Sequence, residues 1–174
     1  GWEIRGTTPP ISKYVAILAH HTSLWDGPLL IAMSFYFQIP AYWIAKDSLF
    51  RGPIGPLLRR FGGVPINRSS SQNIVEQVIQ IFEKNDEFVL ALAPEGTREA
   101  TKCWKTGFYH MAQGAKVPIA MVYIDYEKKI CGMGPLIDPT GDMMADLKEI
   151  AVFYEDVKGK HPSRQGTVVL DTSE

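Results

Sequence analysis

The sequence has 174 residues, a length that fits one domain with a sizeable hydrophobic core. Hydrophobic residues make up 45% of it and charged residues 21%, which excludes a disordered or fibrous protein. The formal net charge of -1 gives no reason to expect nucleic acid as a partner, so an anionic ligand would have to meet a local cluster of Lys and Arg. The two cysteines have neither metal-site spacing nor a disulfide framework, which fits a reducing compartment.

Strand and helix patterns alternate along the chain, which predicts an α/β fold: a single domain over residues 1–174 with a central, mostly parallel or mixed sheet flanked by helices. Predicted strands cover residues 14–19, 40–45, 64–67, 88–93 and 118–126, and residues 128–133 are expected to pair with the last of these. Predicted helices cover residues 27–37, 49–61, 106–115 and about 142–158, with another whose apolar face spans 74–82. The longest apolar stretch, residues 28–37, is too short to span a membrane.

The first candidate site lies where the predicted strand 14–19 ends. His21 and Asp26 follow it, separated by four residues. An imidazole beside a carboxylate can take a proton from an alcohol near neutral pH. Taken alone, the pair is more simply read as a solvated loop histidine beside a helix-capping aspartate. His20 adjoins His21, but neighbouring side chains on an extended segment point to opposite sides, so no metal site is expected.

Further polar residues follow other predicted strands, and the carboxyl ends of such strands are where open α/β sheets bind ligands. A single Lys or Arg is most simply a solvated surface cation, but several at one edge could converge on a phosphate. The chain contains neither a G-x-S-x-G serine motif nor a glycine-rich nucleotide loop. The residues at these junctions are Lys46, Arg68, Glu95, Gly96, Thr97, Arg98 and Lys105.

Four motifs in order, between residues 15 and 122, resemble the glycerolipid acyltransferase family, which includes bacterial 1-acyl-glycerol-3-phosphate acyltransferases. Spacing and order make the likeness specific, and the short chain resembles a compact bacterial branch. The matching segments are the His-x4-Asp stretch 20–26, the glycine-rich approach to an arginine at 62–68, Glu-Gly-Thr-Arg at 95–98, and Val-Pro-Ile at 117–119.

The resemblance implies a glycerol-3-phosphate acyltransferase-like fold and an O-acyltransferase of phospholipid biosynthesis. Such an enzyme moves a fatty acyl group from acyl-CoA or acyl carrier protein to the free hydroxyl of a lysophospholipid, here 1-acyl-glycerol-3-phosphate, to give phosphatidic acid. It implies no cofactor or metal, and peripheral contact with the cytoplasmic face of the inner membrane. His21 would be the base and Asp26 its orienting partner. The acceptor would be held by Arg68, Glu95, Gly96, Thr97, Arg98, Lys105 and Lys46.

The sequence departs from the family pattern at several positions. His20 stands where the family usually has Asn, Asn67 where an acidic residue is common, and Ala100 where a second Arg often follows. These departures leave the His-Asp pair intact and leave the acceptor's head group open. The alternatives are another lysolipid or an amino-acid lipid as acceptor, hydrolysis of a thioester by the same pair, and a lipid-binding module without catalysis.

Overall fold

The computed structural model describes residues 1–67, 71–166 and 168, and its centre is a seven-stranded mixed sheet with strand order β1-β7-β6-β2-β5-β3-β4. The neighbours from β6 to β4 are parallel, whereas β7 runs antiparallel to β6 and parallel to β1. The predicted α/β fold is therefore confirmed. The strands are β1 (Glu3–Arg5), β2 (Lys13–Ala19), β3 (Ala41–Lys46), β4 (Gly63–Ile66), β5 (Phe88–Leu92), β6 (Ile119–Asp125) and β7 (Ile130–Ile137).

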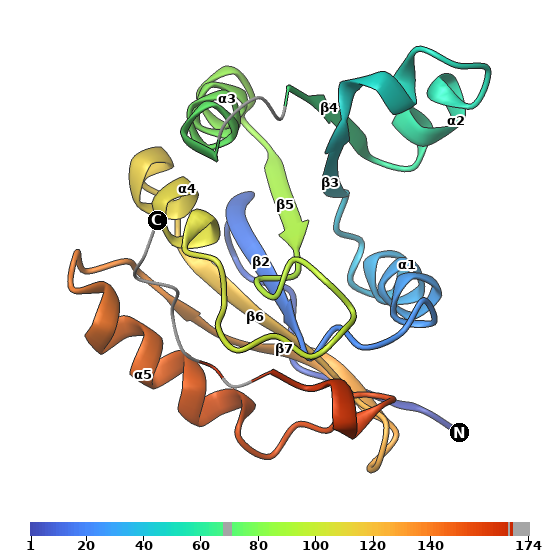
Figure 1. Ribbon diagram of the computed structural model, residues 1–174, viewed down its shortest axis with the longest axis vertical. Coiled ribbons are helices and arrows are strands. Elements are labelled where there is room, and N and C mark those ends of the chain that lie inside the picture. Colours follow the sequence, from blue (N-terminus) through green and yellow to red (C-terminus); the bar gives the residue numbers. More distant parts are fainter. Residues whose placement is uncertain (68–70, 167, 169–174) are drawn as a thin grey trace.

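Helices cover both faces of this sheet (Figure 1). Because successive side chains of a strand point to opposite faces, β2 serves two cores. Val15, Ile17 and Ala19 pack with α3, α4 and α5, while Tyr14, Ala16 and Leu18 pack with α1. The helices are α1 (Asp26–Phe37), α2 (Gly55–Arg60), α3 (Ser71–Lys84), α4 (Gly107–Ala115) and α5 (Met143–Tyr154), with 3-10 turns at Asp47–Phe50 and Pro162–Arg164.

Three elements differ from the sequence-based expectation. The edge strand β1 pairs with β7 but has only three residues, of which Glu3 and Arg5 are polar, so no apolar pattern marks it. The helix expected over residues 49–61 is a 3-10 turn followed by α2, because Gly52 and Pro53 interrupt it. Helix α5 ends at Tyr154 rather than at residue 158, and the chain then turns so that Val157 still reaches the core.

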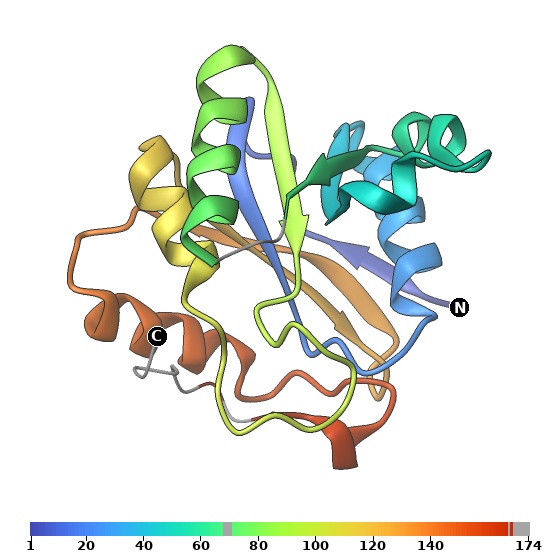
Figure 2. The same cartoon turned by 45° about the horizontal axis from the view of Figure 1, so that its top comes forward.

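Several connecting segments meet at the carboxyl end of the parallel strands, where open α/β sheets bind ligands. The long β5–α4 connection and the segment after α5 run past the same end of the sheet as the loop between β2 and α1 (Figure 2). Since β2 lies between β5 and β6, its exit is flanked on both sides by loops from neighbouring strands.

Candidate active site

The loop from His20 to Trp25 connects the buried strand β2 to α1, whose first residue is Asp26. His21 Nδ1 lies 2.8 Å from Asp26 Oδ2. Because the carboxylate can only accept, we assign the proton to Nδ1, which leaves Nε2 of the ring as the basic nitrogen. The His21 side chain is 27% exposed and that of Asp26 only 1%, so the base reaches the surface while its partner is sealed inside.

The Asp26 carboxylate has two further hydrogen bonds. The backbone N–H of Ser23 donates to Oδ2 over 3.1 Å, and the hydroxyl of Tyr126 donates to Oδ1 over 2.7 Å. Burial alone would raise the pKa of Asp26, but the hydrogen bonds from His21, Tyr126 and Ser23 outweigh it and hold the pKa below its usual range. Asp26 is therefore a carboxylate at neutral pH and keeps the imidazole in one tautomer.

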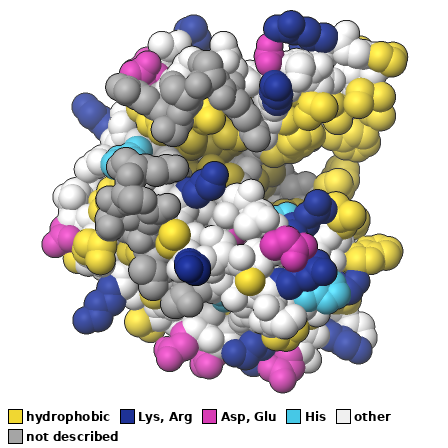
Figure 3. Space-filling view, in the orientation of Figure 1, with side chains coloured by type: hydrophobic (Ala, Val, Ile, Leu, Met, Phe, Trp, Pro, Cys, Tyr) yellow, Lys and Arg dark blue, Asp and Glu magenta, His cyan; other side chains and the backbone are white. Residues whose placement is uncertain are grey.

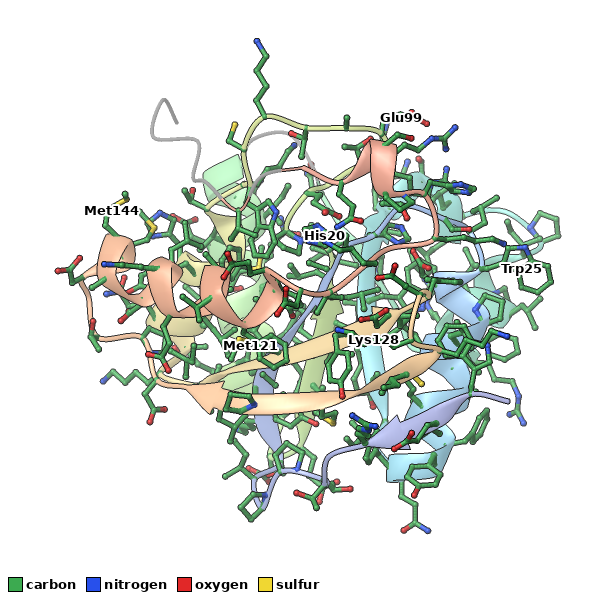
Figure 4. The ribbon with its side chains drawn as sticks, turned by 90° about the horizontal axis from the view of Figure 1, so that it is seen from below. His20, Trp25, Glu99, Met121, Lys128 and Met144 are labelled. Carbon is green, nitrogen blue, oxygen red and sulfur yellow. The ribbon has the colours of Figure 1, made fainter. Side chains whose placement is uncertain are left out.

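A second histidine–carboxylate pair lies directly behind the first. His20 Nδ1 is 3.1 Å from Glu95 Oε1, and the backbone N–H of His21 donates to Glu95 Oε2 over 2.7 Å. Both side chains are buried, and Figure 4 shows His20 in the interior while Trp25 points away at the edge. Glu95, expected as a substrate contact, thus has both oxygens on the histidine loop, where it holds the backbone of His21.

The turn after β5 brings the other predicted residues of this motif beside the histidine loop. Gly96 has a φ of 65°, in the left-handed region, and the Lys105 side chain lies over it, 3.1 Å from where a Cβ would be. The Thr97 hydroxyl accepts the backbone N–H of Glu99, and the Arg98 side chain is exposed. The motif therefore presents one exposed cation, Arg98, and Lys105, which follows the motif in sequence, adds a second cation at Gly96.

The two remaining predicted cations are placed differently. Lys46 ends β3, which lies on the other side of β5 from β2, and it is exposed. Arg68 lies outside the described residues. The role of either one in binding a ligand stays a prediction.

Sequence reasoning missed Tyr126 and the pairing of His20. Tyr126 comes one residue after β6, and in the parallel register of β2 and β6 Ala19 pairs with Tyr123. Three residues beyond that pair, the chain is at the same edge as the histidine loop. The polar hydroxyl of Tyr126, at the end of the apolar stretch 118–126, could therefore have marked it as a candidate. Only the strand order shows that it lies beside the histidine loop.

The segment after α5 packs against the histidine loop. The backbone N–H of His161 donates to the Thr22 hydroxyl over 3.1 Å, and a Cβ on Gly159 would lie 2.8 Å from that same oxygen. Lys160 places its ammonium 5.1 Å from the centre of the Trp25 ring, a cation–π contact. The loop that carries the base is thus held in place by a segment more than 130 residues away in sequence.

The described residues contain no group of three or more His, Cys, Asp or Glu side chains placed to hold a metal ion. None of the helices described is both long enough and apolar enough to cross a membrane.

The protein is thus an α/β protein with an oriented histidine at the carboxyl edge of its sheet. Such a histidine is what general-base chemistry requires. Residues 3–125 match the Acyltransferase family, and the chain belongs to that family. The matched region contains both histidine–carboxylate pairs and the turn after β5.

A solved structure has a similar fold. It is the crystal structure of the 1-acyl-sn-glycerophosphate (LPA) acyltransferase PlsC from Thermotoga maritima, with a TM-score of 0.59 and 20% sequence identity. The match covers 85% of this chain and 66% of that one, so this chain spans just under two thirds of the length of its structural relative. No curated protein sequence matches the chain.

Proposed function

We propose that this acyltransferase moves a fatty acyl group from a thioester, acyl-CoA or acyl carrier protein, to the free hydroxyl of a lysophospholipid. The acceptor we favour is 1-acyl-glycerol-3-phosphate, which gives phosphatidic acid. The observation that carries the proposal is the His21 ring, oriented through Nδ1 by a buried Asp26 while the side chain remains partly exposed. Membership of the Acyltransferase family supports it.

The chemistry follows from this geometry. The acceptor hydroxyl is a poor nucleophile until His21 Nε2 takes its proton during attack on the thioester carbonyl carbon. The tetrahedral oxyanion then collapses, the C–S bond breaks, and the imidazolium gives its proton to the departing thiolate. Asp26 stays ionised throughout and stabilises the imidazolium, as the aspartate does in a serine triad. The products are an ester and a free thiol. The steps as written use no group besides the two substrates and these side chains.

The phosphate of the acceptor would bind to the cations around the turn after β5. Arg98 and Lys105 are both exposed there, and no ion pair is found for either among the residues described. Gly96 lets the backbone approach a ligand, and Thr97 adds a hydroxyl. Lys46, at the end of β3, and Arg68 would complete the acceptor site.

A lipid acceptor also requires access to a membrane. Figure 3 shows hydrophobic side chains gathered over α1 and α2. Since α1 starts at Asp26, this surface adjoins the base, and we propose that it makes peripheral contact with the cytoplasmic face of the inner membrane. The exposed large apolar residues of α1, α2 and the segments next to them are Leu24, Trp25, Ile31, Phe35, Tyr36, Leu49, Ile54, Leu57 and Phe61.

The function is tested by thiol release from acyl-CoA and acyl carrier protein with a panel of lysolipids, with products identified by mass spectrometry. We expect His21→Ala to abolish transfer, while His110→Ala, an exposed histidine of α4, leaves it unchanged. A folded His21→Ala protein with near-normal turnover would refute the mechanism. Thiol release without any acceptor, at a rate comparable to transfer, would show a hydrolase instead.

The acceptor site is tested by Arg98→Ala against Lys84→Ala, an exposed lysine at the end of α3. We expect the Arg98 variant alone to raise the KM for a phosphate-bearing acceptor about 10-fold or more, as the loss of a charge-assisted hydrogen bond implies. An unchanged KM would remove Arg98 from the site.

Membrane contact is tested by co-sedimentation with vesicles that contain anionic phosphatidylglycerol. Replacing Phe35 and Tyr36 by Ser should weaken binding, because both are exposed on α1. The control is Val152→Ser, which removes an apolar side chain equally exposed on α5. If the control loses as much binding, the surface over α1 and α2 is not the contact.

A further inference from the structure

Tyr126 joins the site from a distant part of the chain. It lies 100 residues from Asp26 in sequence, and its hydroxyl donates to Asp26 Oδ1 over 2.7 Å. Neither the His-x4-Asp stretch nor the Glu-Gly-Thr-Arg motif contains it. The contact arises because β6, which precedes Tyr126, is the parallel neighbour of β2.

The two oxygens of Asp26 are not equivalent. Oδ2 is shared by His21 Nδ1 and the backbone N–H of Ser23, whereas Oδ1 has only the Tyr126 hydroxyl as donor among the residues described. At 1% exposure the carboxylate has no access to bulk water that could replace this donor. Without the hydroxyl, Oδ1 would be a buried charged acceptor left unsatisfied, and the carboxylate could turn to relieve it.

Tyr126 is itself held firmly enough to act as a fixed donor. Trp2 packs edge-on against its ring, with the ring centres 5.2 Å apart, and its backbone N–H donates to the Lys158 carbonyl over 2.8 Å. Burial, and then the hydrogen bond to Asp26, raise the pKa of Tyr126 well above its usual value, so the hydroxyl keeps its proton.

We propose that Tyr126 is a positioning residue for acyl transfer: it fixes the plane of the Asp26 carboxylate, so that Oδ2 faces His21 Nδ1 and the imidazole stays aimed at the acceptor hydroxyl. This inference rests on the proposed function. Because Tyr126 acts through Asp26, its contribution belongs to the rate of the chemical step and not to the binding of either substrate.

The first test is Tyr126→Phe, which removes only the hydroxyl. We expect kcat to fall about 10- to 100-fold, the factor that a hydrogen bond to a charged group represents, with both KM values unchanged. Tyr123→Phe is the matched control, because it removes a hydroxyl from β6 that has no bond to Asp26. An unchanged kcat in Tyr126→Phe, or an equal loss in the control, would overturn the proposal.

A double-mutant cycle separates positioning through Asp26 from a general structural effect. Tyr126→Phe is combined with Asp26→Asn, and we expect almost no further loss of kcat in that background, because the group through which Tyr126 acts is already gone. If Tyr126→Phe costs the same factor in both backgrounds, the tyrosine does not act through Asp26.

A third measurement does not depend on turnover. With 15N-labelled histidine, the ring nitrogen shifts of His21, assigned by comparison with His21→Ala, report which nitrogen carries the proton. Tyr126→Phe should move these shifts toward those of Asp26→Asn, and unmoved shifts would overturn the proposal. Should His21→Ala keep its turnover, the proposed function fails; should only the Tyr126 results fail, the function stands and this inference falls.

Discussion

The hydrogen bond between His20 and Glu95 should contribute to the free energy of unfolding, and the structure allows us to estimate by how much. His20 is 6% exposed and Glu95 4%, and His20 Nδ1 is the partner of Glu95 Oε1. His20→Ala leaves that buried oxygen without its donor, a loss of about 1.5–3 kcal/mol for a hydrogen bond to a charged group. The imidazole also packs edge-on against Tyr154, a contact worth about 0.5–1.5 kcal/mol.

We therefore expect His20→Ala to lower the free energy of unfolding by about 2–4 kcal/mol, which is a fall in Tm of about 5–15 °C for a chain of this size. His20→Asn is the informative comparison, because the Asn amide nitrogen is attached to Cγ as Nδ1 is in His and can donate to the same oxygen. This variant loses only the ring packing, so its cost should be about 0.5–1.5 kcal/mol.

Urea unfolding followed by the fluorescence of the four tryptophans measures these differences. His161→Ala is an exposed control that should change stability by less than about 0.5 kcal/mol. Equal losses in the Ala and Asn variants would show that ring packing, and not the bond to Glu95, is what His20 contributes. A loss below about 0.5 kcal/mol in His20→Ala would refute the reasoning altogether.

Two further predictions concern stability outside this pair. Gly96→Ala should cost about 1–2 kcal/mol in urea unfolding, because the residue has a φ of 65°, whereas Gly52→Ala, with open space at its Cβ position, should be nearly neutral; equal costs would contradict this. Tyr109→Phe removes a 2.6 Å hydrogen bond to the buried Asp146 and should cost about 1.5–3 kcal/mol at pH 7. Burial would raise the pKa of Asp146, but hydrogen bonds from Tyr109 and Thr140 lower it, so its contribution exists above the unfolded pKa and is lost as the pH falls through the folded one. The stability gap between wild type and variant, measured by urea unfolding from pH 7 to pH 3, should therefore shrink below about pH 4, and a constant gap would exclude the carboxylate as the cause.

Much of the fold is predictable from local patterns. The continuous apolar runs of β2 and β5 predict buried strands, because a strand covered on both faces needs apolar residues at successive positions. Helix α1 follows from the apolar stretch after Asp26, and α3 from its helical spacing of apolar residues. The pair of His21 and Asp26 is predictable too, because its members are five residues apart and the geometry depends only on a strand exit and a helix start.

The rest depends on which strands become neighbours. Glu95 reaches the histidine loop because β5 flanks β2 on one side, and Tyr126 reaches Asp26 because β6 flanks it on the other. Strand β1 exists only through its pairing with β7. Sequence alone determines which residues are apolar, which segments are extended or helical, and which base stands beside which carboxylate within one loop. Only the tertiary structure decides which distant donors satisfy the buried carboxylates, because strand order and register are set by packing across the whole sheet.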